Sequence, residues 1–282
     1  MSSALDRAIA SLDRLIVLAP PYATIPSFFR YVPVEPSEHN HFLESVQRLR
    51  GNVYFEDGAI TADELTSDGR HETPEDSRAW HLLMRARTGV TACVSYFEHE
   101  DASSVEELRV RKCPLNHTTD WRNTFRRAVE AELGRARRER LRYVELGGWA
   151  VAPTERHRGD GLLLALAAYS LGRAFGGSLG LTTATVRHAS STILRKLGGT
   201  SLEVDGTAVP AYYDSRYRCE MELLRFDSRQ PNPKFAPVIE RLMQRMSGLP
   251  VLVTSDRFAR PAPSAVRVPA WQLMPAVGGS AA

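Results

Sequence analysis

The chain has 282 residues, of which 43% are hydrophobic and 24% charged, and its formal net charge is +3. This composition is typical of a globular protein with a real core, long enough for one large domain or two small ones. So small a net charge does not favour a nucleic-acid partner. The first twenty residues interrupt their apolar positions with charges, and no apolar run is long enough to span a membrane. We therefore expect a cytoplasmic protein without a signal peptide or transmembrane segment.

The cysteine pattern argues against a disulfide framework. The chain has an odd number of cysteines, three, and they are widely spaced at Cys93, Cys113 and Cys219. No C-x-x-C pair occurs. His39 and His41 form an H-N-H sequence, but no partner ligands follow at zinc spacing. We expect reduced thiols and no metal site.

Apolar residues at helical spacing, ended by proline or glycine, predict the helices. The predicted helices span residues 3–18, 38–49, 117–140, 161–177, 188–199 and 234–247. Between the second and third helices, residues 51–80 are rich in acidic and turn residues, which favours a long loop with one short helix near residues 63–65. Residues 255–282 lack periodicity and predict a flexible tail.

The strands are rich in β-branched, aromatic and other apolar residues. The predicted strands span residues 80–86, 90–99, 143–151, 178–186, 218–226 and 249–254. A Thr-Gly pair between the first two predicts a hairpin. Within the third strand, Gly147 and Gly148 indicate a bulge or a close backbone approach. Strands and helices alternate, which predicts an α/β fold with at least one parallel strand pair.

Directly after the third strand, the chain reads V-A-P-T-E-R-H-R-G-D-G at residues 151–161. A strand that runs into a helix start with arginines and glycines is suited to an anion. The helix N-terminus offers free N–H groups and the positive end of its dipole. Glycines allow close approach, and arginines bind phosphate oxygens. Neither the P-loop pattern nor G-x-G-x-x-G is present, so we predict a pyrophosphate cradle of another kind. The alternative is a glycine-containing helix start with solvated arginines.

This segment resembles the acyl-coenzyme A motif of the GNAT N-acyltransferase superfamily, V-x-P-x-x-R-x-x-G-x-G. The matching positions are Val151, Pro153, Arg156, Gly159 and Gly161. The resemblance covers roughly residues 78–226. It implies a mixed, mostly antiparallel twisted sheet with a splayed central parallel strand pair, flanked by helices. We expect an N-terminal helical segment over residues 1–50, an acyltransferase domain over 51–254 and the tail beyond it.

A narrower resemblance links V-E-L-G-G-W-A-V, at residues 144–151, to the acyl-homoserine-lactone synthases and the long-chain N-acyl amino acid synthases. It implies that Glu145 is the general base. Gly147 and Gly148 replace the Ser-Arg pair of the lactone synthases. The usual superfamily tyrosine and asparagine fall on Leu194 and Arg187. Another proton donor is therefore needed, or the proton comes from water.

The resemblance implies acyl transfer from a phosphopantetheine thioester, on coenzyme A or an acyl carrier protein, to an amine such as an amino acid. Binding of the donor is expected at Trp149, Val151, Arg156, His157, Arg158, Gly159, Asp160 and Gly161. Backbone N–H groups near residues 149–151 would stabilise the oxyanion. Tyr212 and Tyr213 are candidate proton donors, although such tyrosines more often only pack. Glu145 could instead be a buried carboxylate paired with an arginine such as Arg187.

Five arginines precede the Glu145 strand, at Arg135, Arg137, Arg138, Arg140 and Arg142. Such a run is most often a solvated helix face, but it also suits an acidic acyl carrier protein. Nucleic acid is disfavoured because no stacking aromatics interleave with the arginines. The resemblance to the N-acyl amino acid and lactone synthases implies a long-chain N-acyltransferase. An acetyl-coenzyme A acetyltransferase and a non-catalytic thioester sensor stay open as alternatives.

Overall fold

The computed structural model describes residues 11–99, 104–156, 159–187 and 190–255. Nine strands form one sheet in the order β11-β1-β2-β3-β4-β5-β10-β6, with β9 paired to β10, and β7 and β8 form a separate small hairpin. The strands are β1 (Leu15–Leu18), β2 (Trp80–Ala86), β3 (Gly89–His99), β4 (Arg142–Val151), β5 (Ser178–Thr185), β6 (Thr200–Ser201), β7 (Glu203–Val204), β8 (Thr207–Ala208), β9 (Tyr212–Asp214), β10 (Cys219–Asp227) and β11 (Val251–Leu252).

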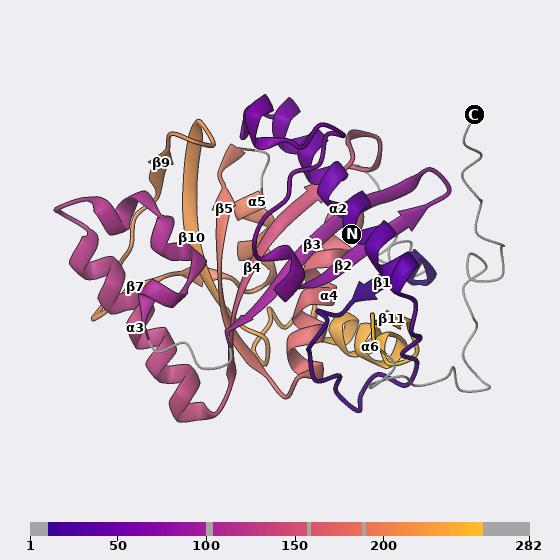
Figure 1. Cartoon of the computed structure of the whole chain (residues 1–282). Coiled ribbons are helices and arrows are strands. Elements are labelled where there is room, and N and C mark those ends of the chain that lie inside the picture. Colours follow the sequence, from indigo (N-terminus) through magenta and orange to yellow (C-terminus); the bar gives the residue numbers. More distant parts are fainter. Residues whose placement is uncertain (1–10, 100–103, 157–158, 188–189, 256–282) are drawn as a thin grey trace.

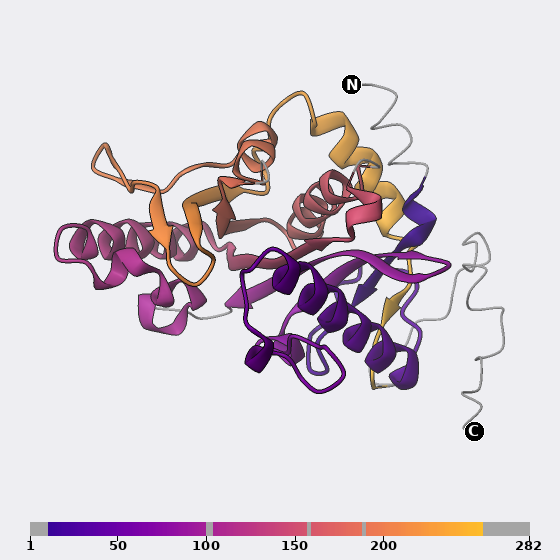
Figure 2. The same ribbon diagram turned by 90° about the horizontal axis from the view of Figure 1, so that it is seen from above.

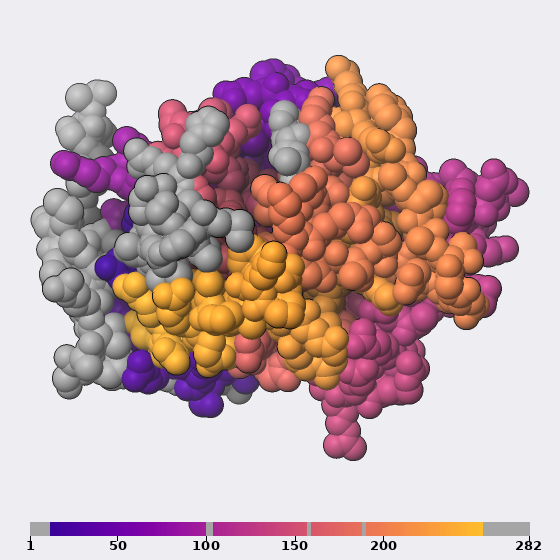
Figure 3. All heavy atoms as spheres, turned by 180° about the vertical axis from the view of Figure 1, so that it is seen from behind, coloured from indigo at the N-terminus to yellow at the C-terminus, as the bar shows by residue number. Residues whose placement is uncertain are grey.

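Helices cover both faces of the sheet (Figure 1, Figure 2). On one face, α2 packs over β1–β3, and α3 packs over β4, β5 and β10. On the other face, α4, α5 and α6 enclose the largest apolar cluster. Figure 3 shows this second face, where α6 appears in yellow. The helices are α2 (Pro36–Glu56), α3 (Arg122–Glu139), α4 (Asp160–Ala174), α5 (Ser190–Leu197) and α6 (Ala236–Met246).

Short 3-10 turns connect these elements, and three of them, η3, η5 and η7, carry residues of the candidate site. They are η1 (Ser11–Arg14), η2 (Ala62–Glu64), η3 (Asp76–Arg78), η4 (Val105–Glu107), η5 (Arg109–Lys112), η6 (Pro114–His117) and η7 (Pro153–Glu155). The short helix predicted near residues 63–65 corresponds to η2. The segment before α3 contains three such turns, η4, η5 and η6, and the sequence analysis does not predict them.

The sheet confirms the predicted fold class. Most neighbouring strands are antiparallel, while β4 pairs with β5, and β1 with β11, in parallel. The predicted hairpin is β2–β3, and the remaining predicted strands correspond to β4, β5, β10 and β11. In the part of the chain that the structure describes, no helix is long and apolar enough to cross a bilayer.

Two predicted elements near the N-terminus are wrong in part. Residues 15–18, predicted to be helical, form β1, because this fully buried apolar run lies in the sheet between β2 and β11. The loop predicted to start at residue 51 begins with the end of α2. Gly51 does not break that helix; it lets the helix approach the carbonyl of Gly69, which a Cβ would strike.

The predicted division at residue 50 falls inside α2, and the division into segments otherwise stays a prediction. Most of the tail predicted over residues 255–282 lies outside the described residues, as do residues 3–10 of the first predicted helix. The three cysteines are free and buried, as expected for reduced thiols. Burial raises the pKa of the Cys93 thiol to about 12.

Candidate functional site

The parallel strands β4 and β5 part in the middle of the sheet. They are paired from Arg142–Ser178 to Leu146–Thr182. Beyond that point β4 runs on to Val151, and no further pairing joins it to β5 within the described residues. The two inner edges therefore carry backbone N–H and C=O groups without a ladder partner in the other strand, although the carbonyls of Gly148 and Trp149 accept from Cys93 and Tyr54. This opening is the splay that the sequence led us to expect.

A bulge in β4 lies where the strands part, directly after Gly147, at Gly148 and Trp149. The register against β3 shifts there, and Gly148 has a φ of +61°. A Cβ on Gly147 would lie 2.9 Å from the Arg109 guanidinium, and one on Gly148 would lie 3.3 Å from that of Arg50. The predicted break is thus a bulge. Arginines of η5 and α2 occupy the space that side chains on β4 would otherwise fill.

The V-x-P-x-x-R-x-x-G-x-G segment forms the junction between β4 and α4. After η7, Arg156 is exposed and lies 3.7 Å from the Asp57 carboxylate at the end of α2. Gly159 caps α4 with a φ of +85°, a conformation that favours glycine. The first turn of α4 then presents its N–H groups and the positive end of the helix dipole. His157 and Arg158 of this motif lie outside the described residues.

Two residues of the motif serve the packing of the helix. The Asp160 side chain is buried, and its carboxylate accepts a hydrogen bond of 3.1 Å from Arg14 of η1. A Cβ on Gly161 would lie 3.2 Å from Val151 and 3.4 Å from Trp149. Gly161 therefore lets α4 lie close against β4. We expected its missing Cβ to make room for the donor, but the atoms nearest to that position belong to the protein.

Glu145 is buried on β4, on the face that η5 covers. Its Oε2 accepts hydrogen bonds of 2.7 Å from His99 Nε2 and from the Arg109 backbone N–H. Its Oε1 accepts one of 2.7 Å from the Val110 N–H. The expected alternative, an ion pair with Arg187, is wrong, because Arg187 instead donates to the carbonyls of Asp57 and Tyr217. Since each carboxylate oxygen has two lone pairs, one remains on Oε1.

The two candidate tyrosines lie on β9, beyond β10 and away from the opening. Tyr212 is buried against Cys113, and burial raises its pKa above the ordinary value. Tyr213 is 65% exposed. Tyr54 of α2 is instead next to the opening, where its hydroxyl donates to the Trp149 carbonyl at 3.4 Å. No sequence signal distinguishes Tyr54 from other tyrosines, because only packing of α2 brings it to β4.

In the structure, the five arginines before β4 fall into two groups, one with carboxylate partners and one at the exposed end of α3. Arg135 pairs with Glu139 and Asp227, and Arg142 pairs with Glu98. Arg137, Arg138 and Arg140 are exposed at the end of α3. A docking surface for an acyl carrier protein stays a prediction, and it would rest on these last three residues.

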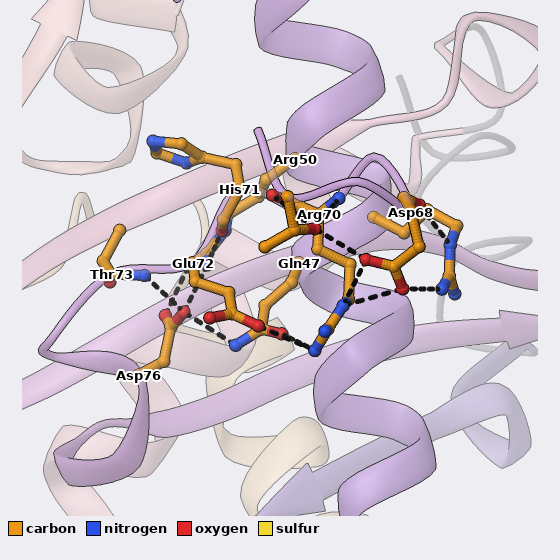
Figure 4. Close-up of polar contacts among 10 residues, drawn as sticks. Gln47, Arg50, Asp68, Arg70, His71, Glu72, Thr73 and Asp76 are labelled. Atoms are coloured by element: carbon orange, nitrogen blue, oxygen red, sulfur yellow. Dashed lines mark hydrogen bonds and ion pairs between the residues drawn. The ribbon is translucent and has the colours of Figure 1, made fainter. Parts of the chain in front are cut away.

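A buried polar network fixes α2 to the segment before β2 (Figure 4). Arg50 donates to both oxygens of Asp76, at 2.7 and 2.6 Å, and to the His71 carbonyl. Burial alone would raise the pKa of Asp76, but its hydrogen bonds with Arg50 lower it to about 2. His81 donates to the Asp76 carbonyl, and burial lowers its pKa to about 4. The network thereby holds η3 in place.

A cavity of about 980 Å³ lies between η3 and η5, at the end where β4 begins. Its wall includes Glu75, Arg78, Phe97, His99, Arg109 and Arg142. His99 joins this cavity to Glu145. No group of three or more His, Cys, Asp or Glu side chains is placed to hold a metal ion within the described ranges.

No family model and no curated protein matches the chain in sequence. Solved structures do match. FeeM, an N-acyl amino acid synthase from uncultured soil microbes, shares 13% identity at a TM-score of 0.45, over 71% of this chain and 90% of its own. BjaI, a CoA-dependent acyl-homoserine lactone synthase, shares 16% identity at 0.48, over 92% and 97%.

A putative N-acetyltransferase from Lactobacillus plantarum shares 13% identity at a TM-score of 0.39, over 66% of this chain and 90% of its own.

Proposed function

We propose that the protein is an N-acyltransferase that moves an acyl group from a phosphopantetheine thioester to an amine. One observation carries this proposal: β4 and β5 part after Leu146, and β4 then leads through η7 and Arg156 toward the start of α4, which Gly159 caps. The helix start supplies N–H donors and positive potential for a phosphate. The open strand edges supply partners for the amides of a pantetheine arm. The thioester would then lie beside the bulge at Gly148.

Each chemical requirement of the reaction has a candidate group near the bulge. The amine nitrogen attacks the thioester carbonyl carbon, and Glu145 Oε1 takes the proton that the nitrogen loses. Backbone N–H groups of residues 149–151 stabilise the oxyanion. When the carbon–sulfur bond breaks, the thiolate accepts a hydrogen bond from Tyr54, whose hydroxyl is beside β4 and whose pKa is raised by burial, and it takes its proton from water. Tyr54 replaces Tyr212 and Tyr213 in this role, because it lies at the opening and they do not.

The length of the acyl group separates two versions of the proposal. The sequence resemblance favours a long-chain donor, carried by coenzyme A or by an acyl carrier protein at Arg137, Arg138 and Arg140. The packing favours a short donor at one point: the small side chains of β3 that a tunnel for a long chain would need, Ala92 and Val94, are buried in the apolar cluster under α4. An acetyl-coenzyme A acetyltransferase is therefore the second candidate.

The test uses acyl-coenzyme A thioesters from acetyl to decanoyl with a mixture of amino acids. We expect free thiol to be released only with acceptor present, faster for long donors. Arg156→Ala should weaken coenzyme A binding about tenfold by calorimetry, since a charge-assisted phosphate contact is lost. Arg127→Ala is the matched control, because Arg127 is 64% exposed on α3, far along the chain from the motif.

Three other results of this test would each change the proposal. Acetyl-coenzyme A as the best donor would select the acetyltransferase. Tight binding without turnover of any thioester would select the sensor. Equal affinity of the Arg156→Ala variant and the wild type would remove the cradle from the proposal.

A further inference from the structure

His99 lies at the end of β3, where it joins Glu145 to the cavity between η3 and η5. Its side chain is buried, with 5% exposed, and it is one of the residues that line the cavity. Phe97 packs edge-on against it at 4.7 Å between ring centroids, and the Tyr143 ring lies 6.5 Å away on β4. The imidazole is therefore held in place at the boundary between a buried carboxylate and a space that a ligand can enter.

The two nitrogens of this ring have different surroundings. Nε2 lies 2.7 Å from Glu145 Oε2. Glu145 accepts backbone N–H groups of η5 on both of its oxygens, so we assign it as the acceptor of this third bond as well, and Nε2 as the donor. The proton of a neutral imidazole is then on Nε2, and Nδ1 keeps a lone pair. No group in the described part of the chain bonds to Nδ1.

This pairing is suited to proton transfer. A histidine that donates one ring N–H to a buried carboxylate can accept a proton on its other nitrogen, because the carboxylate fixes the tautomer and stabilises the imidazolium that forms. The same pairing also occurs around metal ions. A metal ion would need further ligands, however, and the described residues contain no group of three or more His, Cys, Asp or Glu side chains placed to supply them.

The proposed reaction removes two protons from its acceptor. An alkylamine arrives mainly as an ammonium ion at neutral pH, because its pKa is near that of lysine, about 10.4. One proton must leave before the nitrogen has a lone pair with which to attack. The second leaves as the carbon–nitrogen bond forms, and Glu145 Oε1 has a lone pair to take it. The first proton needs another acceptor, which the amine must meet before it reaches Glu145.

The cavity supplies a path on which the amine meets His99 first. Arg109 lines the cavity, and its guanidinium lies against Gly147, where β4 and β5 part. The cavity and the opening therefore adjoin through this side chain, with His99 in the cavity wall and Glu145 behind it. Charges of both signs line the cavity, among them the carboxylate of Glu75, so an ammonium group can enter.

We propose that His99 is a second base of this site, which takes the first proton of an ammonium acceptor on Nδ1. This inference rests on the proposed function. An N–H bond of the ammonium ion breaks, its electron pair stays on the nitrogen, and the proton converts His99 to an imidazolium paired with Glu145. His99 then passes this proton to water. The neutral amine attacks the thioester carbonyl carbon beside an unprotonated Glu145, whose Oε1 takes the proton that the attack releases.

The experiment compares two acceptors of similar size that differ in basicity, ethylamine and trifluoroethylamine. At neutral pH ethylamine is almost wholly ammonium, whereas the fluorines withdraw electrons and leave trifluoroethylamine mostly neutral. Thiol release from the acyl-coenzyme A that gives the fastest turnover measures kcat/KM for each amine. His99→Gln is the test variant, because a glutamine amide can still donate to Glu145 but has no basic nitrogen.

We expect His99→Gln to lower kcat/KM about a hundredfold for ethylamine, as for a positioned base, and less than about threefold for trifluoroethylamine. Glu145→Gln should lower both by similar factors, because each amine loses its second proton there. His41→Gln, on the exposed face of α2, is the control and should change neither. Both amines are measured on one preparation, so any unfolded fraction cancels from their ratio. His99→Asn replaces His99→Gln if the glutamine variant does not fold.

Two results would overturn the proposal while leaving acyl transfer intact. Equal losses for the two amines in His99→Gln would make His99 only a positioning residue for Glu145. Unchanged kcat/KM for ethylamine would remove His99 from the chemistry altogether. Absence of thiol release by the wild type with every amine would instead reject the acyltransferase and the second base together.

Discussion

At the scale of single residues, Glu145 has two roles that one substitution exposes. It is the proposed base, and it also holds η5 by accepting the N–H groups of Arg109 and Val110. A glutamine at this position has one acceptor oxygen, and its NH₂ group would face a hydrogen-bond donor. We expect Glu145→Gln to lower the free energy of unfolding by about 1–3 kcal/mol, as for a lost bond to a charged group.

If Glu145 is also the general base, Glu145→Gln should lower turnover as well as stability. Turnover per folded molecule should fall at least a hundredfold, within the range of a positioned base. Raising the pH should recover part of it, because more acceptor amine is then neutral. Thermal unfolding and thiol release, measured on the same preparation, separate the two roles. A less stable variant with near-normal turnover would leave Glu145 as a purely positioning residue.

At the scale of elements, the contact of α4 with β4 depends on Gly161. A valine there would drive its Cβ toward Val151 and Trp149 and force the helix away from the strand. Overpacking of this kind typically costs about 1–3 kcal/mol. We expect Gly161→Val to lower stability by this amount in urea unfolding and to weaken coenzyme A binding as a consequence. Full stability with weakened binding would instead place the ligand, not the strand, against Gly161.

At the scale of the whole molecule, stability should fall in acid through buried groups that include His81 and Asp76; burial also lowers the pKa of His39 and of His71. His81 has a pKa lowered from 6.5 to about 4 by burial, so the folded state resists its protonation. The stability that this neutral imidazole contributes is present above pH 6.5 and is lost as the pH falls toward 4. Each pKa unit corresponds to about 1.4 kcal/mol, which gives a loss of roughly 3 kcal/mol.

The Asp76 pKa, lowered from 3.8 to about 2, acts over a lower window. Its stabilisation is present above pH 4 and is lost as the pH falls toward 2. Urea unfolding between pH 7.5 and 4 should therefore show decreasing stability, and His81→Gln should flatten that slope. His41→Gln, on the exposed face of α2, is the control and should keep it. A wild-type stability that does not change over this range would contradict the assignment.

The sequence by itself determined six of the strands, the longer helices and the junction at residues 151–161; these strands are β2, β3, β4, β5, β10 and β11. These depend on local signals: apolar periodicity, a glycine pair that requires a bulge, and a glycine at the positive-φ cap of α4. It also identified Glu145 as a buried acid. It could not assign β1, because four apolar residues suit a helix or a strand equally until β2 and β11 lie beside them.

Only the tertiary structure decided which groups meet. Glu145 contacts His99 and η5, rather than Arg187, because the register of β3 against β4 and the path of residues 104–117 bring them together. The same holds for Arg50 with Asp76, for Tyr54 beside β4, and for the cations around the cavity. These are long-range contacts between side chains, set by packing of whole elements, and local residue pattern carries no information about them.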